Sequence, residues 1–187
     1  MKAIVCKEFG PPSALVLEEM EPLSPKKNEI LIDIHAAGVN FPDTLIIKDM
    51  YQFKPALPFT PGNEVAGIVS AVGEEVTNYK VGDEVMAMPP FGGYAEQIIV
   101  TPGQVSKKPA NMDFATAACF STTYGTSHYG LKDKAKLKEG ETVLILGASG
   151  GVGISAIEIA KAMGAKVIAA ASTDEKLAVC KEDGADE

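Results

Sequence analysis

The sequence is poor in the side chains that build disulfide frameworks and metal centres. Its 187 residues include only three cysteines, Cys6, Cys119 and Cys180, and two histidines. The cysteines are widely spaced, so they form neither a disulfide framework nor a metal-ligand pair. No stretch reads as a signal peptide, and no apolar run is long enough to span a bilayer. We therefore expect a cytoplasmic protein that keeps its thiols reduced and does not cross a membrane.

Basic residues are also fewer than acidic ones. The chain carries 17 Lys and Arg against 25 Asp and Glu, a formal net charge of −8, and its sequence pI is near 4.9. This balance argues against nucleic acid or an anionic membrane as the main partner. The composition, 46% hydrophobic and 22% charged, is that of an ordinary globular protein.

Residues 142–172 contain the clearest structural pattern. The apolar, β-branched segment Thr142–Leu146 predicts a strand buried on both faces, and the glycine-rich segment 147–153 predicts a turn. Apolar residues then recur at helical spacing from Ile154, and Lys166–Ala171 predicts a second buried strand. Strand, glycine turn, helix and strand form the opening unit of a dinucleotide-binding fold.

The glycine turn suits a pyrophosphate group. Gly150 and Gly153 occupy the second and third glycine positions of the GxGxxG pattern, whereas Ala148 stands at the first. Glycines let the backbone approach the phosphates, and the N–H groups that open the helix point at the anion. A purely structural turn is the alternative. On the first interpretation the cofactor-binding residues are Ala148, Ser149, Gly150, Gly151, Val152 and Gly153.

The end of the second strand bears on which dinucleotide binds. An NAD site usually has Asp or Glu there to hold the ribose 2′-OH, but this chain has Ser172 and Thr173, followed by Asp174 and then Lys176. The small hydroxyls leave space for a 2′-phosphate, which Lys176 could neutralise. Ser172 or Thr173 could also serve as the N-cap of the next helix. We favour NADPH, although the nearby Asp174 keeps NADH open.

The first part of the chain is rich in strands and turns. Alternating patterns and turn residues predict six strands, at Lys2–Lys7, Leu15–Met20, Glu29–His35, Glu64–Gly73, Glu84–Met88 and Tyr94–Val100. Phe41–Lys48 is predicted to be a short helix, and a helical region from Asp113 to Leu137 is predicted to break near Gly125 and Gly130. So many short strands suggest a compact antiparallel barrel.

We therefore expect two domains, residues 1–120 and residues 121–187. The second holds only the first part of a dinucleotide-binding domain, because such a domain generally needs about six parallel strands. Gly184-Ala185-Asp186 resembles a turn into a third strand. We expect the chain to be a fragment of a longer protein.

Four motifs in this order resemble one known family: Gly38–Asp43, Pro61–Gly67, Val81–Val85 and Gly150–Gly153. They are similar to those of the medium-chain dehydrogenase/reductase superfamily, and most of all to its zinc-free NADPH:quinone oxidoreductase branch, the ζ-crystallin-like proteins. The resemblance implies an α/β plus β fold, in which a GroES-like antiparallel barrel domain precedes a Rossmann domain that is incomplete in this chain. It also implies a homodimer.

The resemblance also identifies where zinc would bind in zinc-dependent relatives. Those enzymes have Cys where Asn40 stands, His where Asn63 stands and a third Cys near Ala118. Two carboxamides and an alanine do not provide the donors that catalytic zinc needs, so we expect no metal. A substitute site would have to come from less favoured candidates, namely Cys119, Glu64 and His35.

Without zinc, reduction of an electron-poor acceptor is easier than oxidation of an alcohol. The resemblance implies that Asn40 and Tyr51 lie beside the nicotinamide, where each can donate a hydrogen bond to the acceptor oxygen, and that Thr126 lies against the cofactor. In the alternative interpretation Asn40 is a helix N-cap, Tyr51 packs in a loop and Thr126 packs in a helix.

We therefore predict a zinc-independent oxidoreductase that transfers hydride from NADPH to a small-molecule acceptor, a quinone or an activated carbonyl or alkene. Two alternatives stay open. One is an enoyl reductase that acts on acrylyl-CoA or a 2-alkenal, and the other is a protein that binds NADPH without turnover.

Overall fold

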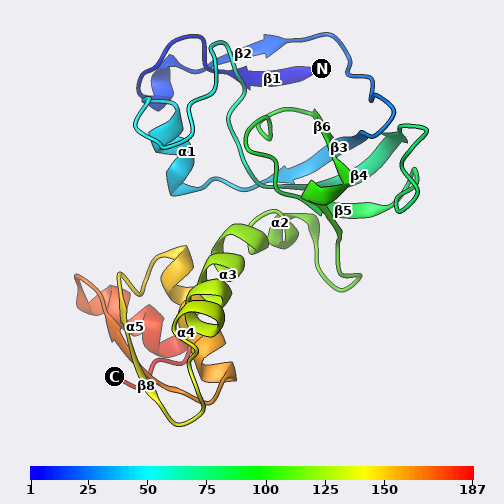
Figure 1. Ribbon diagram of the computed structural model, residues 1–187. Helices are drawn as coiled ribbons and strands as arrows, with labels where there is room; N and C mark the ends of the chain where they lie inside the picture. The colour runs from blue at the N-terminus through cyan, green and yellow to red at the C-terminus, as the bar shows by residue number, and fades with distance from the viewer. The chain divides into compact units, whose positions relative to one another are not determined.

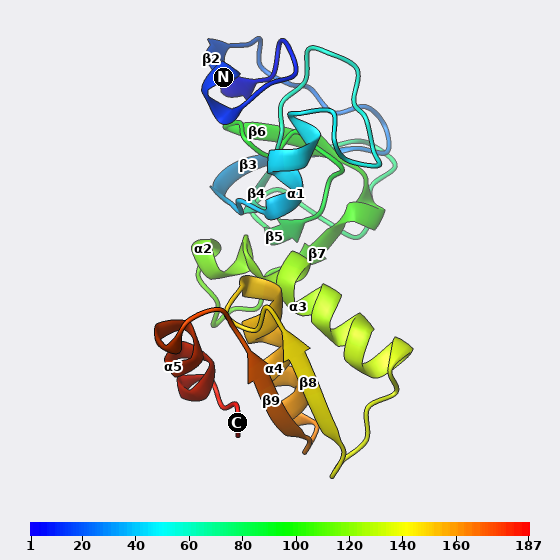
Figure 2. The ribbon, with the colours of Figure 1, turned by 90° about the vertical axis from the view of Figure 1, so that its left-hand side faces the viewer.

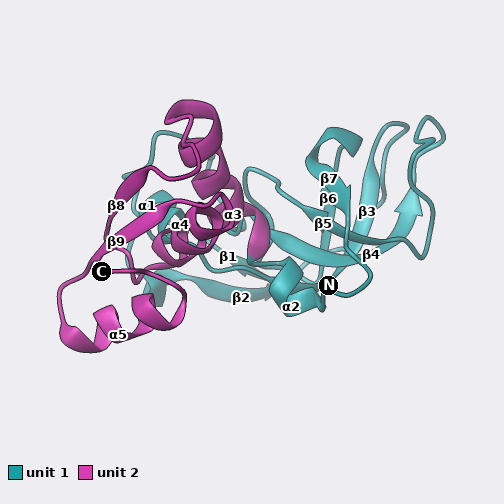
Figure 3. Cartoon of the chain, turned by 90° about the horizontal axis from the view of Figure 1, so that it is seen from below, with its two compact units in different colours: residues 1–119 teal, residues 120–187 magenta.

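The computed structural model describes all 187 residues, which divide into two compact units at Cys119/Phe120 (Figure 3). Unit 1 comprises residues 1–119 and unit 2 comprises residues 120–187. Assignment of these units as the two domains expected from the sequence remains a prediction. No helix of the chain is both long enough and apolar enough to cross a membrane.

Unit 1 is built on antiparallel β-structure (Figure 1). Five strands form one sheet in the order β6-β3-β4-β5-β7, with β6 and β7 at its edges, and β1 pairs with β2 in a separate hairpin. Backbone hydrogen bonds from Ile4 to Tyr94 and from Glu96 to Lys2 tie this hairpin to the segment before β6. The strands are β1 (Lys2–Val5), β2 (Val16–Glu19), β3 (Ile30–Ala37), β4 (Val65–Val72), β5 (Glu84–Ala87), β6 (Gln97–Val100) and β7 (Val105–Lys107).

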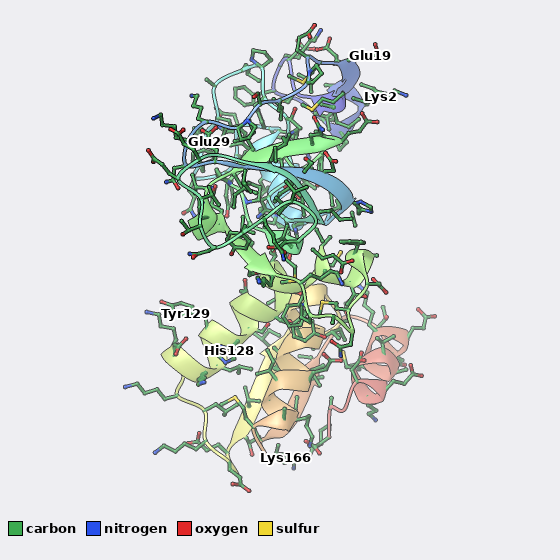
Figure 4. The ribbon with its side chains drawn as sticks, turned by 90° about the vertical axis from the view of Figure 1, so that its right-hand side faces the viewer. Lys2, Glu19, Glu29, His128, Tyr129 and Lys166 are labelled. Carbon is green, nitrogen blue, oxygen red and sulfur yellow. The ribbon has the colours of Figure 1, made fainter.

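All six strands predicted from the sequence are present, although most are shorter than predicted and β3 extends two residues further. Their alternating side chains make the core of unit 1, in which Ile30, Ile32, Val65 and Val69 are fully buried. In the β1–β2 hairpin, Lys2 and Glu19 are paired across the two strands (Figure 4). Strand β7 is not predicted from the sequence, because three residues are too few to show the alternation of apolar and polar side chains that marks a strand.

The helices of unit 1 are short: η1 (Pro12–Ala14), α1 (Phe41–Ile46), η2 (Pro102–Gln104) and α2 (Phe114–Ala117). The predicted helix at Phe41–Lys48 is confirmed as α1, which begins after Asn40 and has proline in its first turn. Asp49, with φ of +57°, turns the chain just beyond it.

Unit 2 contains one strand–helix–strand crossover (Figure 2). β8 and β9 are parallel and in register from Thr142↔Lys166 to Leu146↔Ala170. Beyond α5, the Asp186 N–H donates to the Val167 oxygen (2.9 Å), so the last residues lie beside β9. The third strand expected from the sequence remains a prediction. The elements are α3 (Phe120–His128), the π-helical segment η3 (Tyr129–Lys134), β8 (Thr142–Leu146), α4 (Gly151–Ala162), β9 (Lys166–Ala170) and α5 (Asp174–Glu182).

Three predictions for unit 2 need correction. β8 is not buried on both faces, because the side chains of Leu144 and Leu146 are 58% and 75% exposed while Ile145 faces the core. α4 begins at Gly151, three residues before the predicted start. Gly125 does not break the helical region, because α3 runs through it.

Candidate functional site

The glycine bend after β8 is held by backbone geometry. Gly147 has φ of +63°, a left-handed conformation that glycine adopts without strain. The Gly150 N–H donates to the Gly147 oxygen (3.1 Å), which closes the turn, and Gly150 is the N-cap residue of α4. Ala148, which replaces the first glycine of the pattern, is fully buried. The bend therefore forms without a glycine at position 148.

Gly153 allows the helix to pack directly on the bend. A Cβ at this position would lie 2.4 Å from the oxygen and 2.6 Å from the Cα of Ala148. No side chain fits there, which is the helix-packing role of the third glycine in a dinucleotide-binding turn. A Cβ on Gly150 would meet nothing closer than the Gly147 oxygen at 3.5 Å. Gly150 is therefore free of any packing requirement, which suits a position that faces a ligand.

The first N–H groups of α4 lie at an exposed turn, although Gly153 itself is buried. The Ile154 N–H donates to the Gly150 oxygen (2.8 Å), so the N–H groups of Gly151, Val152 and Gly153 precede the helical ladder. Gly150, Gly151 and Val152 are exposed. Unpaired N–H groups and the positive end of the helix dipole favour an anion at this place.

The end of β9 lies beside the bend, because the Ala148 N–H donates to the Ala170 oxygen (3.1 Å). Two residues later, the Ser172 hydroxyl accepts a hydrogen bond from Lys176 Nζ (3.1 Å). Thr173 is the N-cap of α5 and its hydroxyl accepts from the Lys176 N–H (3.3 Å), so this alternative for Thr173 is confirmed. The cap uses only the backbone of Lys176, and the exposed ammonium of its side chain lies close to the Ser172 hydroxyl.

A buried hydroxyl cluster joins α3 to the start of α4. The Ser127 hydroxyl donates to the Val152 oxygen (2.7 Å), and the Ser155 hydroxyl lies 2.9 Å from the Ser127 hydroxyl and 3.0 Å from the same Val152 oxygen. Thr126, the predicted cofactor contact, is exposed on α3 beside this cluster. Sequence reasoning missed Ser127 and Ser155, because small polar residues in a helix give no signal that they are buried against each other.

In unit 1, the half-buried Asn40 belongs to a polar cluster. Its Nδ2 group lies 3.3 Å from Asn63 Oδ1 and 3.2 Å from Glu64 Oε2. Glu64 is only 1% exposed. The structure thus brings together the two amides at the positions of the relatives' zinc ligands and places a carboxylate beside them.

Asp43 connects the backbone of Asn40 to the side chain of Tyr94. Asp43 Oδ2 accepts from the Asn40 backbone N–H (2.8 Å) and from the Tyr94 hydroxyl (2.8 Å). Burial and then the hydrogen bond to Asp43 raise the pKa of Tyr94 above its ordinary value, so the phenol stays a donor. The sequence analysis did not select Tyr94, which no local pattern connects to Asp43.

Ala118, next to Cys119, packs against Gly38 beside this cluster. A Cβ on Gly38 would lie 2.3 Å from the Ala118 oxygen and 3.1 Å from Glu64 Oε2, so the segments make a close contact that only glycine permits. Burial, and the negative charge of Glu64, raise the pKa of the Cys119 thiol. Both effects favour the neutral thiol over the thiolate.

The donor set does not fit catalytic zinc. Carboxamides stand at positions 40 and 63, and the Asn40 amide presents N–H donors rather than a ligating atom. His35 stacks on Phe114, with ring centroids 4.5 Å apart. No group of three or more His, Cys, Asp and Glu side chains in the chain is arranged to hold a metal ion.

Tyr51 lies in a different environment from Asn40. It is partly buried and packs against an apolar cluster that includes Ile46, Ile47 and Phe59. This contact is the loop packing that the sequence left open as an alternative, and a catalytic role for Tyr51 remains a prediction. His128 and Tyr129 are exposed at the end of α3 (Figure 4).

Comparison with known proteins agrees with this geometry. The family model for the alcohol dehydrogenase GroES-like domain matches residues 26–110, and the model for zinc-binding dehydrogenases matches residues 151–187. The quinone oxidoreductase of Sus scrofa is 43% identical over 189 residues, which cover 100% of this chain and 57% of the relative.

Solved structures give the same result. The quinone oxidoreductase of Escherichia coli, crystallised with NADPH, superposes with a TM-score of 0.95 at 35% identity, over 99% of this chain and 57% of that one. The chain belongs to the medium-chain dehydrogenase/reductase superfamily. Within the superfamily it is similar to quinone oxidoreductases. The CurK enoyl reductase, another structural neighbour, has a TM-score of 0.89 at 34% identity, over 100% of this chain and 57% of that one.

Membership in this superfamily accounts for both units. Strands β3 to β7 lie in the stretch that matches the GroES-like domain, and the β8-α4-β9 crossover has the strand–helix–strand pattern that opens a Rossmann domain. The chain spans 57% of the length of the curated quinone oxidoreductases it matches first.

Proposed function

We propose that this member of the superfamily is an NADPH-dependent oxidoreductase that reduces a quinone or an activated carbonyl or alkene without a metal. The observation that supports the proposal is the hydrogen bond between Ala148 and Ala170, which joins the glycine bend to the end of β9, two residues before the Ser172 that contacts Lys176. We infer that the bend holds a pyrophosphate and that the Lys176–Ser172 pair holds a 2′-phosphate. A related quinone oxidoreductase, from Escherichia coli, was crystallised with NADPH.

In the proposed complex, the N–H groups of Gly151, Val152 and Gly153 hold the pyrophosphate. The Lys176 ammonium and the Ser172 hydroxyl hold the 2′-phosphate, since charge-assisted hydrogen bonds to phosphate are strong. The other residues that we propose to contact the cofactor are Thr126, Ala148, Ser149, Gly150 and Thr173. When bound, NADPH supplies the hydride.

Asn40 is the proposed donor to the acceptor oxygen. Its two amide contacts, at 3.2 Å and 3.3 Å, are longer than a typical N–H···O bond. In the proposed complex an acceptor oxygen takes the place of one of them. An N–H donor stabilises the negative charge that develops on a quinone or carbonyl oxygen after hydride transfer. Tyr51 is the proposed second donor of a hydrogen bond or a proton.

A specific observation favours a second acceptor class. The CurK structure that this chain resembles is an enoyl reductase, and an enoyl thioester also develops negative charge on its carbonyl oxygen when it accepts hydride. The same Asn40 amide can serve either acceptor. A protein that holds NADPH without turnover is the remaining alternative.

Turnover of the full-length protein tests the proposal. NADPH oxidation is followed with 1,4-benzoquinone, a 2-alkenal and acrylyl-CoA as acceptors. Fastest turnover with the quinone supports the quinone reductase, whereas fastest turnover with acrylyl-CoA or the alkenal supports the enoyl reductase. Tight NADPH binding with no turnover on the panel would refute both and favour the non-catalytic alternative.

From the family resemblance we also propose a cytoplasmic homodimer. Light scattering on the full-length protein tests the oligomeric state: twice the mass of the full-length chain supports a dimer, and a single-chain mass contradicts it.

A further inference from the structure

Tyr94 contacts both segments that carry the proposed catalytic amide and its partner. On one side its hydroxyl donates to Asp43 Oδ2 (2.8 Å), and the same oxygen accepts the backbone N–H of Asn40 (2.8 Å). Asp43 is only 6% exposed, so water competes little for this oxygen. One atom, Asp43 Oδ2, therefore accepts hydrogen bonds from both the Tyr94 hydroxyl and the Asn40 backbone.

On the other side, the Tyr94 ring packs on the loop that leads to Asn63. A Cβ on Gly62 would lie 2.5 Å from Cδ1 and 2.8 Å from Cε1 of this ring, and Gly62 has φ of +94°. The Tyr94 N–H donates to the Pro61 oxygen (2.9 Å). The ring and backbone of one residue therefore fix the position from which Asn63 extends.

We propose that Tyr94 is a positioning residue that sets the separation and orientation of the Asn40 and Asn63 amides. The proposal rests on the proposed function, because it concerns the same donor, Asn40. Asn40 Nδ2 and Asn63 Oδ1 lie only 3.3 Å apart, and each is attached to a segment that Tyr94 holds. Loss of the hydroxyl frees Asp43 from one of its two donors and lets the start of α1 shift relative to the loop at position 62.

The test uses Tyr94→Phe in the full-length protein, which removes the hydroxyl and keeps the ring on Gly62. The matched control is Tyr79→Phe, because the Tyr79 hydroxyl also donates one hydrogen bond within unit 1, to the Val105 oxygen (2.6 Å). We expect Tyr94→Phe to lower kcat about tenfold with little change in the KM for NADPH. The control keeps kcat within about twofold. Wild-type kcat in Tyr94→Phe, or an equal loss in both variants, overturns the proposal.

A double variant separates positioning from general destabilisation. In an Asn40→Ala background there is no amide to position, so adding Tyr94→Phe should cause no further loss of kcat. If the two losses multiply, Tyr94 acts independently of Asn40 and the proposal is wrong.

A second measurement does not depend on turnover. The side-chain amide signals of Asn40 are recorded by ¹⁵N–¹H NMR of the full-length protein and assigned by their disappearance in Asn40→Ala. Tyr94→Phe should shift these signals and Tyr79→Phe should not, and unchanged signals in Tyr94→Phe overturn the proposal. If the wild-type protein oxidises no NADPH, the proposed function fails while this comparison still decides the positioning role.

Discussion

The backbone N–H of Ala148 donates a hydrogen bond to the carbonyl oxygen of Ala170 over 3.1 Å. Because β8 and β9 are parallel, their carboxyl ends lie at the same edge, and this bond joins the glycine bend to the end of β9. Just beyond that end of β9, the Lys176 ammonium contacts the Ser172 hydroxyl (3.1 Å). We propose that coenzyme selection follows from this arrangement.

Lys176→Ala tests which coenzyme the site selects. Loss of the ammonium should weaken NADPH binding about tenfold and leave NADH binding nearly unchanged, because only NADPH has the 2′-phosphate. Calorimetry on the full-length protein measures both dissociation constants. Lys181→Ala, in the last turn of the same helix, is the control and should change neither. Equal weakening of NADPH and NADH by Lys176→Ala would contradict this assignment.

Two glycines of the bend should respond differently to alanine. Gly153→Ala places a Cβ 2.4 Å from the Ala148 oxygen and should lower the free energy of unfolding by about 2 kcal/mol, because the backbone there has no room to move. Gly150→Ala should change it by less than about 0.5 kcal/mol yet weaken NADPH binding, since its Cβ stands where the phosphates approach. Chemical denaturation and calorimetry distinguish the two, and a stable Gly153→Ala variant would disprove the packing argument.

The hydroxyl cluster between α3 and α4 should behave as a unit. Ser127→Ala and Ser155→Ala should each lower the free energy of unfolding by about 1–2 kcal/mol, because each removes a buried hydroxyl within hydrogen-bond distance of the Val152 oxygen. The double variant should lose less than the sum, since the two hydroxyls lie 2.9 Å apart and share this network. Urea denaturation of all three variants measures the coupling, and strict additivity would argue against the shared network.

Stability at alkaline pH should reflect Tyr124. A hydrogen bond to Glu158, and then burial, raise the pKa of Tyr124 to about 12 from its model-compound value of 10.0. The folded state therefore holds this proton more tightly than the unfolded state, and the resulting stabilisation is present below pH 10 and is lost as pH rises from 10 to 12. Tyr124→Phe should be less stable than the wild type at pH 8, with a difference that shrinks above pH 10. A difference in unfolding free energy that is constant with pH would contradict the account.

The sequence predicted the features that local patterns determine. Alternating residues identify β3 and β4, and the glycines of 147–153 identify the bend, because periodicity and backbone freedom are properties of neighbouring residues. The apolar periodicity of α4 begins only at Ile154, so the pattern does not reveal the glycines of the first turn, which are poor helix formers. They are tolerated in the first turn, where the N–H groups need no helical partner.

Contacts between distant residues were beyond the reach of such patterns. Tyr94 and Asp43 are 51 residues apart in sequence and Ser127 and Ser155 are 28 apart, so only the fold brings each pair together. Burial of Leu144 and Leu146 was wrongly predicted for a related reason. An apolar run shows that a strand can be buried on both faces, but burial itself depends on which other segments cover the sheet.

The most direct test of the central claim is the rate of NADPH oxidation by the full-length protein with 1,4-benzoquinone, before and after exhaustive dialysis against EDTA. We predict undiminished turnover after dialysis and a loss of most of it in Asn40→Ala, because a side-chain amide rather than a metal ion stabilises the developing oxyanion. Turnover that disappears on dialysis and returns when zinc is added would contradict the account.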